Sequence, residues 1–202
     1  MRIETVLNHC YRHKSFVYAG VHWEQIGKKD ALVVDIVPRK NGLAECSVCG
    51  VPAAVYDHLD ERQFDFVPLW NIPVYFRYTM RRVACSVHGV RVERVPWADG
   101  KSHLTKPFQL FLAKWARKLS WKETAQSFGT TWDNVFRSVK AVVAYGMKHR
   151  NLDGITAIGV DEIQYGKGHQ YLTLVYQIDQ GKRRLLFAGR DRKAKTLLRF
   201  FR

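Results

Sequence analysis

Hydrophobic and polar residues follow different patterns in three successive parts of this 202-residue chain. In the first part, residues 1 to about 30 are poorly periodic, with a short helix or strand expected only near the start. The β-branched segment 31–37 predicts a strand, and the aromatic segment 64–83, which two prolines interrupt, predicts two short strands. The first part therefore predicts a small module of β-hairpins from about residue 31 to 97.

The second part, residues 104–150, has apolar residues three and four positions apart, as in amphipathic helices. Ser120 and Glu123 form a capping-box sequence at the start of a short second helix, which Gly129 is suited to end. Two helices, a turn and a longer third helix predict a helix-turn-helix; a plain three-helix bundle with a solvated basic face is the alternative. The expected buried stripes are Leu104, Phe108, Phe111, Leu112, Trp115 and Leu119 in the first helix, and Val135, Val139, Val142 and Val143 in the third.

The third part, after Asn151, predicts three strands joined by short turns and then a helix. Such a meander followed by a helix matches the opening of a ribonuclease-H-like fold. The strands are expected at 155–163, 171–178 and 184–188, and the helix from 193 to 201.

Two pairs of residues with metal-ligand chemistry lie in the β-hairpin module. Cys46 and Cys49 are separated by two residues, and so are Cys85 and His88. Each gap lets one tight turn direct two ligands at one ion, and four such ligands complete a closed, structural zinc site. The alternative is four unrelated core residues. The predicted fold class is therefore α+β and multidomain, with a zinc-ribbon-like module (1–98), a helix-turn-helix (99–150) and the first strands of a ribonuclease-H-like domain (151–202).

Charge adds a partner to this picture. Lys and Arg number 33 against 18 Asp and Glu, a formal charge of +15, which favours a polyanionic partner over a merely soluble basic surface. The sequence has no apolar run of about 18 residues to span a membrane, and its start lacks the apolar region of a signal peptide. We therefore expect a reducing, cytoplasmic location, where paired cysteines bind metal rather than form disulfides.

The start of the third helix carries residues that suit DNA recognition. In a helix-turn-helix this end enters the major groove, where Asn pairs with adenine and Arg with guanine, while Lys meets phosphate. The candidate contacts are Thr130, Thr131, Trp132, Asn134, Arg137 and Lys140.

Asp161 ends a strongly apolar strand, where an acid is costly unless it is solvated, paired or bound to metal. Asp179 and Asp191 are expected roughly 23 Å and about 10 Å away, too far to share an ion with Asp161. From these residues alone, an exposed acid at the end of a strand is favoured over a metal ligand.

Nearly the whole chain resembles the N-terminal half of bacterial insertion-sequence transposases of the ISL-three family. The motifs that carry the resemblance are the two ligand pairs, Arg81-Arg-Val83, Val95-Pro-Trp-Ala98, Leu119-Ser-Trp-Lys-Glu123, Trp132-Asp-Asn-Val135, Ile158-Gly-Val-Asp-Glu162, Gly168-His-Gln-Tyr171 and Arg183-Arg-Leu-Leu186. Such modules commonly have Cys where this chain has His88, which zinc also accepts.

The resemblance implies a zinc module, a helix-turn-helix and a DDE catalytic domain in which Asp161 is the first catalytic aspartate. Two further carboxylates, which hold Mg²⁺ with it, lie further along in longer relatives, so we expect a truncated transposase that binds DNA but does not cut it alone. The implied partners are double-stranded DNA of the element's inverted repeats, and a second copy or a full-length transposase. The implied location is the bacterial nucleoid. A non-catalytic DNA-binding regulator or inhibitor is the alternative function, and a zinc-ribbon RNA binder is disfavoured by the helix-turn-helix.

Overall fold

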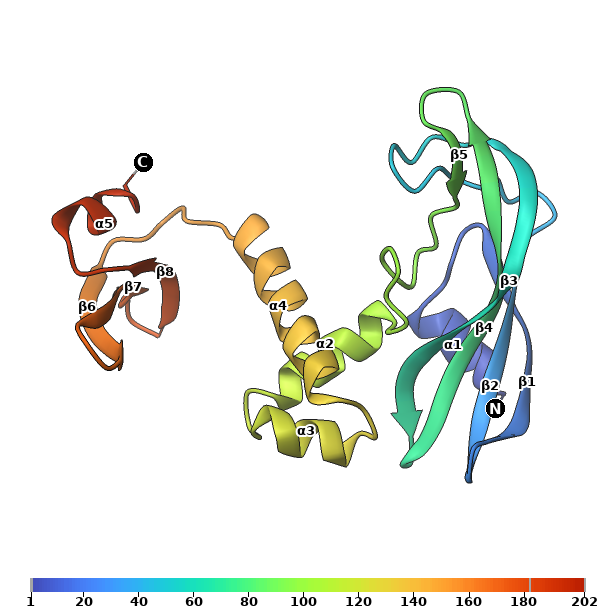
Figure 1. Cartoon of the computed structure of the whole chain (residues 1–202), viewed down its shortest axis with the longest axis horizontal. Helices are drawn as coiled ribbons and strands as arrows, with labels where there is room; N and C mark the ends of the chain where they lie inside the picture. The colour runs from blue at the N-terminus through green and yellow to red at the C-terminus, as the bar shows by residue number, and fades with distance from the viewer. Residues whose placement is uncertain (1, 182, 202) are drawn as a thin grey trace. The chain divides into compact units, whose positions relative to one another are not determined.

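The computed structural model describes residues 2–181 and 183–201 and divides into two compact units, 1–148 and 149–202 (Figure 1). Both units combine helices with sheets, so the predicted α+β class is confirmed. The elements are α1 (Ile3–Cys10), β1 (Phe16–Ile26), β2 (Lys29–Pro38), β3 (Ala54–Leu69), β4 (Ile72–Cys85), β5 (Gly89–Val92), α2 (Lys106–Trp115), α3 (Trp121–Ser127), α4 (Trp132–Lys148), β6 (Ile158–Gly166), β7 (Gln170–Gln177), β8 (Arg184–Arg190) and α5 (Ala194–Leu198).

Strand β4 is the centre of a five-stranded sheet in the first unit, because it is hydrogen-bonded along both of its edges. Strand β3 pairs with it antiparallel along one edge. The other edge is shared: β2 pairs in parallel with residues 74–77, and β5 pairs antiparallel with residues 82–85. Strand β1 extends the sheet beyond β2 as a hairpin. The end of β4 that carries Cys85 is therefore held between β3 and β5.

Strands β3 and β4 form one long hairpin instead of the two short strands expected in the aromatic segment. Strand β3 already begins at Ala54, and the hairpin turns at Trp70 and Asn71, whose φ angles of 48° and 67° suit a type I′ turn. The register shifts between Phe66 and Leu69, and a proline is tolerated at such an irregularity because no ladder hydrogen bond is lost. Two strands are present as predicted, but β3 is longer than expected because it includes the ten residues 54–63 before the aromatic segment.

Helix α1 and strand β1 occupy the first 30 residues, where the sequence predicted little structure. The segment near Ile3 is a helix, and its Leu7 is buried in the core. Strand β1 has a bulge between Tyr18 and Gly20, and such a shift moves the following side chains to the opposite faces of the sheet. The alternation that identifies a strand is lost at this point, which explains why β1 was missed.

Trp97 lies in the middle of the core on one face of this sheet and is almost fully buried. Its indole ring makes edge-to-face contacts with Phe16, Phe64 and Tyr78, with centroid separations of 4.9, 5.9 and 5.3 Å. Such aromatic pairs add to the free energy of burial. Because Trp97 precedes α2, its packing also holds the chain that leads to the helices.

Helices α2, α3 and α4 pack around a second core. The capping box predicted at the start of α3 is present: Glu123 N–H donates to Ser120 Oγ (3.2 Å), and Ser120 N–H donates to Glu123 Oε2 (2.9 Å). Two residues of the predicted stripes, Trp115 and Val143, are exposed instead. Val143 is 57% exposed because the buried positions of α4 lie in its first half. The second core consists of Leu104, Phe108, Leu112, Ala125 and Val135.

The segment before α2 fastens the helices to the sheet. Asp65 N–H donates to the His103 carbonyl (2.7 Å), and the Asp65 carbonyl accepts from Thr105 N–H (2.9 Å) and Thr105 Oγ (2.8 Å). Thr105 is also the N-cap of α2, since its Oγ accepts from Phe108 N–H. Val67 of β3 packs against both cores. The start of α2 is therefore bound directly to the edge of β3.

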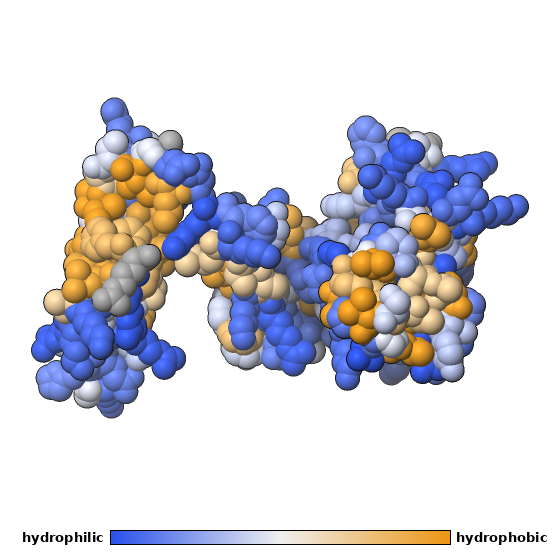
Figure 2. All heavy atoms as spheres, turned by 90° about the horizontal axis from the view of Figure 1, so that it is seen from above, coloured by the Kyte–Doolittle hydropathy of each residue, from blue (hydrophilic) through white to orange (hydrophobic). Residues whose placement is uncertain are grey.

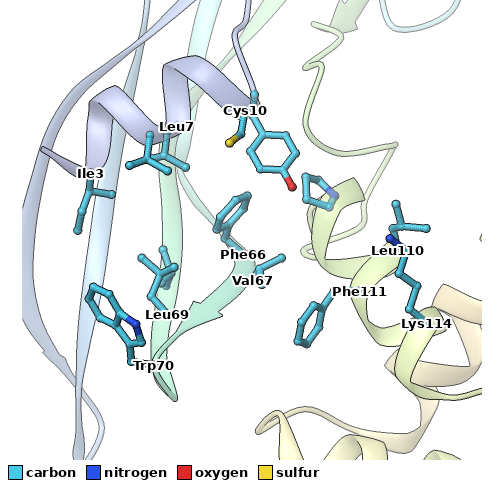
Figure 3. Close-up of a pocket in the computed structure, with 14 residues that line it drawn as sticks. Ile3, Leu7, Cys10, Phe66, Val67, Leu69, Trp70, Leu110, Phe111 and Lys114 are labelled. Atoms are coloured by element: carbon cyan, nitrogen blue, oxygen red, sulfur yellow. The ribbon is translucent and has the colours of Figure 1, made fainter. Parts of the chain in front are cut away.

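An apolar groove of about 480 Å³ lies between α1, the β3–β4 hairpin and α2 (Figure 3). Ile3 and Leu7 line it from α1, Phe66 from the hairpin and Phe111 from α2. Among the described residues that line it, Lys114 carries charge and no acid or histidine is present. The groove is therefore lined mainly by apolar side chains.

The second unit is an antiparallel meander in the order β6-β7-β8, followed by α5, as the sequence predicts. Strand β6 pairs with β7 alone among the described strands, so its outer edge is open. Hydrophobic residues gather on the surface of this unit (Figure 2), and Val160, Ile163 and Tyr165 of β6 are all exposed. In the described part of the chain, no helix is both long enough and apolar enough to cross a membrane.

Candidate metal centre and helix surface

Cys46, Cys49, Cys85 and His88 come together at one end of the five-stranded sheet. Their ligand atoms all lie within 4.8 Å of one another. The two Sγ atoms of Cys49 and Cys85 are 3.7 Å apart, and His88 Nδ1 lies 3.7 Å from Cys85 Sγ and 4.0 Å from Cys46 Sγ. Metal–sulfur bonds of about 2.3 Å in a tetrahedral site place sulfur atoms about 3.8 Å apart. The four side chains can therefore bind one metal ion.

Two turns position these ligands. In the first, Gly50 N–H donates to the Cys46 carbonyl (2.8 Å), and in the second, Cys85 pairs with Gly89 at the start of β5. Gly50 and Gly89 have φ angles of 72° and 68°, a left-handed conformation that glycine adopts without a steric penalty. The glycine after each ligand pair therefore allows the chain to turn back tightly.

The environment of Cys46 favours the thiolate form that binds metal, whereas desolvation and the neighbouring thiols raise the pKa of Cys49. Backbone N–H groups of Cys49 and Val48 lower the pKa of the Cys46 thiol to about 6. Cys46 and Cys85 are buried in a small apolar cluster with Ala44 and Val83, whereas Cys49 is exposed. A site with four protein ligands leaves no position for a reacting water, so this cluster suits a structural role.

Beside the cluster lies a buried ion pair that the sequence analysis missed. Glu93 follows β5 and forms a β-bridge with Cys46, while its carboxylate binds the guanidinium of Arg81 on β4. A signal was present, because Arg81, Val83 and Cys85 occupy alternate positions of one strand and share a face. A charged residue on the same face as a metal ligand predicts a buried partner.

The first turns of α4 expose several of the predicted DNA contacts. Thr131 caps the helix, since its Oγ accepts from Asn134 N–H (3.2 Å). Trp132 is 51% exposed and its ring stacks on Phe136 with an interplanar angle of 2°. Arg137 forms an exposed ion pair with Asp133 (2.7 Å) on the preceding turn. Lys140 is exposed as well.

Asn134 has a different position from the other candidates, because it is only 8% exposed. Its Nδ2 donates to Thr130 Oγ (3.0 Å) and lies 3.3 Å from His103 Nε2. Asn134 and the half-buried Thr130 therefore join the start of α4 to the segment before α2. The structure brings these two side chains together where α4 begins, away from the exposed surface of this helix.

Asp161 is exposed in the middle of β6, opposite Leu174 of β7, and its carboxylate accepts from Glu162 N–H. Asp179 instead bonds Thr156 and Gln177, and Asp191 pairs with Lys193. Among the described residues, no group of three potential metal ligands includes Asp161. The structure thus provides one exposed carboxylate at this position.

Comparison with known proteins gives a consistent result for both units. Residues 158–202 match the DDE transposase family of the ISL3 type, whose description is "Transposase". The chain is 30% identical over 196 residues to the transposase for insertion sequence element IS1557 of Mycobacterium tuberculosis, a match that covers 93% of this chain and 43% of the relative. It is 24% identical over 157 residues to the transposase for insertion sequence element IS1001 of Bordetella parapertussis, covering 77% and 38%.

The chain therefore spans less than half of the length of these relatives. No solved structure matches it.

Proposed function

Because the chain belongs to the ISL-three family of insertion-sequence transposases, we propose that it binds double-stranded DNA at the inverted repeats of such an element. The observation that carries this proposal is the surface at the start of α4. There, Thr131, Trp132, Arg137 and Lys140 are exposed on one helix that follows a capped short helix and a turn. This order of helices supports the proposal of a helix-turn-helix, in which the second helix of the motif enters the major groove.

We assign different roles to the candidate residues of this helix. Arg137 reads guanine, Lys140 binds phosphate, and Thr131 and Trp132 contact the edge of the groove. Asn134, whose amide is already hydrogen-bonded, positions the start of α4 with Thr130 rather than reading adenine. The pair Asp133–Arg137 must open for Arg137 to reach a base, because its guanidinium is held by a carboxylate in the free protein.

The metal of the Cys₃His cluster is proposed to be zinc, with a structural role. Three thiols and one imidazole form a ligand set that zinc prefers, and the sulfur separation of 3.7 Å fits its bond lengths. The metal would hold the turn 46–50 against the β4–β5 hairpin. We therefore propose domains at 1–98 (zinc-ribbon-like), 99–150 (helix-turn-helix) and 151–202 (the first strands of a ribonuclease-H-like domain).

Asp161 is proposed to be the first aspartate of a DDE site. Such sites hold Mg²⁺ between several carboxylates, and the ions activate water or a 3′-hydroxyl for attack on a phosphodiester. Among the described residues, no group of three potential metal ligands includes Asp161. This observation favours a second candidate function, a DNA-binding regulator without strand-transfer activity, which associates with a second copy or with a longer transposase. Either function takes place on chromosomal DNA in the bacterial cytoplasm.

A gel-shift assay tests the proposal directly. The purified chain should shift a duplex that carries the element's inverted repeat more strongly than a shuffled duplex of equal length. A zinc chelator should weaken the shift, and added Zn²⁺ should restore it. Equal binding to both duplexes would contradict recognition of element ends, and binding that survives loss of the metal would contradict the structural role of zinc.

A further inference from the structure

A basic pocket of about 360 Å³ lies in the first unit, away from the start of α4 in the sequence. Three separate segments line it: the loop between α1 and β1, the chain before the first ligand pair, and the chain from β5 to α2. Its charged side chains are Arg12, Lys14, Arg94 and Lys106, with Glu45 as the acid. Four cations against one acid give this pocket a net positive charge.

The cations of this pocket differ from those of the sheet. Arg12, Lys14 and Arg94 are exposed, and none of them forms an ion pair within the described residues. Lys106 pairs with Asp99 at 3.0 Å. By contrast, the arginines of β4 are all neutralised: Arg77 by Glu24 and Glu61, Arg81 by Glu93, and Arg82 by Asp57. The pocket therefore brings together three exposed cations that have no ion pair among the described residues.

Backbone contacts hold the walls of the pocket in place. Arg39 N–H donates to the Ser15 carbonyl (2.9 Å), and Arg94 N–H donates to the Glu45 carbonyl (2.8 Å). A side chain at Gly42 would lie 2.6 Å from the Ser15 carbonyl oxygen, so glycine allows the two loops to approach this closely. The pocket is thus a fixed part of the fold rather than a chance grouping of long side chains.

The imidazole ring of His13 also lines this pocket. It packs against Tyr18 and Trp97, with ring centroids 5.9 and 5.5 Å away. Because Trp97 lies in the core of the first unit, these contacts fix the wall of the pocket between Arg12 and Lys14.

We propose that this pocket binds a backbone phosphate of the DNA duplex. Arginine and lysine are the side chains that hold DNA phosphates, and a phosphate contact positions the protein without reading sequence. Lys106 is the first residue of α2, so the pocket adjoins the group of helices α2, α3 and α4. The pocket adds affinity to the base contacts of α4. This inference rests on the proposed DNA-binding function.

The salt dependence of DNA binding tests the inference. Each lost phosphate contact lowers the slope of log K against log salt concentration by about 0.9. The variant Lys14→Ala/Arg94→Ala should reduce the slope by about 0.9, as for one phosphate, and weaken binding to specific and shuffled duplexes by the same factor. In an ethylation-interference assay, at least one phosphate whose ethylation blocks binding of the unaltered chain should no longer affect binding of this variant. The control Lys28→Ala/Lys167→Ala removes equal charge from two hairpin turns. It should keep the salt slope and the interfering phosphates of the unaltered chain.

A second variant keeps the test decisive if the first one folds poorly. Glu45→Gln removes the acid from the pocket and should strengthen binding to both duplexes equally. Slopes that match the control, together with unchanged binding by Glu45→Gln, would overturn the phosphate pocket while leaving the proposed DNA binding intact. If the unaltered chain fails to bind the inverted repeat or any other duplex, the proposed function fails and the pocket inference fails with it.

Discussion

The carboxylate of Glu93 and the guanidinium of Arg81 form an ion pair that is almost completely enclosed by the protein. Glu93 Oε2 accepts from Arg81 Nε (2.9 Å) and Nη2 (2.6 Å), while Oε1 accepts from Arg81 N–H (2.9 Å) and the Tyr78 hydroxyl (2.5 Å). The side chains are 0% and 8% exposed, respectively. Burial raises the pKa of Tyr78, so its hydroxyl remains a donor. Each carboxylate oxygen of Glu93 therefore accepts two hydrogen bonds.

Removing one member of this pair should be strongly destabilising. Arg81→Met leaves a buried, unpaired carboxylate and should lower the free energy of unfolding by about 3–5 kcal/mol. The double variant Arg81→Met/Glu93→Leu removes both charges and should recover much of that loss. Urea denaturation followed by fluorescence measures both. Arg82→Ala, which breaks the exposed pair with Asp57, is the control and should have a smaller effect; equal effects would contradict the role of burial.

The metal cluster should bind one zinc ion per chain. Cys49→Ser should abolish stoichiometric zinc, and His88→Cys should keep it, because both imidazole and thiolate are zinc ligands. Elemental analysis after gel filtration measures the metal content. Cys10→Ser is the matched control, since this cysteine lies outside the cluster. Because zinc contributes folding free energy of order 10 kcal/mol in small modules, chelation should melt the turn 46–50. Retention of zinc by Cys49→Ser would exclude the proposed ligand set.

The ion pair between Asp133 and Arg137 should oppose DNA binding. Arg137→Ala should weaken binding to the inverted repeat by about 1–3 kcal/mol and relax selectivity at one base pair. Asp133→Asn releases the guanidinium and should tighten binding without loss of selectivity. Fluorescence anisotropy with a series of single-base substitutions measures both. An Arg137→Ala variant that weakens binding equally for every base sequence would show that Arg137 contacts phosphate instead.

The stability of α3 should depend on pH through Glu123. Hydrogen bonds from the Ser120 hydroxyl and backbone lower the pKa of Glu123 below its ordinary value. A carboxyl group with a lowered folded pKa stabilises the fold above its unfolded pKa, and this contribution is lost as the pH falls through the folded value. The melting temperature of Glu123→Ala should therefore lie below that of the unaltered chain at pH 7, and the difference should shrink at pH 3. A difference that is constant with pH would contradict the capping role.

Asp161 should contribute nothing to DNA binding by this chain. It lies on β6 in the second unit, whereas the proposed DNA contacts lie on α4 in the first, so we expect no effect of Asp161→Asn on the gel shift. Fluorescence anisotropy with the inverted-repeat duplex measures the affinity of both proteins. Weaker binding by Asp161→Asn would contradict this expectation.

The clustering of the three cysteines and His88 could be predicted from sequence because the information is local. Two residues between ligands and a following glycine specify each turn, and the hairpins then need only to bring two turns together. The capping box of α3 was predictable for the same reason. Arg81 and Glu93 could not be paired in advance, since their contact depends on the register of β4 and on the position of the chain after β5.

The features that could not be predicted from the sequence depend on contacts between residues far apart in the chain. Nothing in the sequence around Asn134 indicates that His103, some 30 residues earlier, approaches its amide. The bulge in β1 shifts the alternation of its side chains, and only its pairing with β2 reveals it. Val143 continues the apolar spacing of α4 beyond the part of the helix that other elements cover. Periodicity identifies a potential core face, but neighbours determine how far burial extends.

Strand β3 connects the region of the Cys₃His cluster with the start of α2, so its length sets their separation. It begins at Ala54, next to the turn of Cys46 and Cys49, and eleven residues later Asp65 holds the cap of α2, a span of about 36 Å in extended chain. The separation between metal and helices is therefore counted in residues of one strand. Adding two residues to β3 would lengthen the spacing by about 6.6 Å on the same face, whereas adding one would turn the docking carbonyl away from the helices.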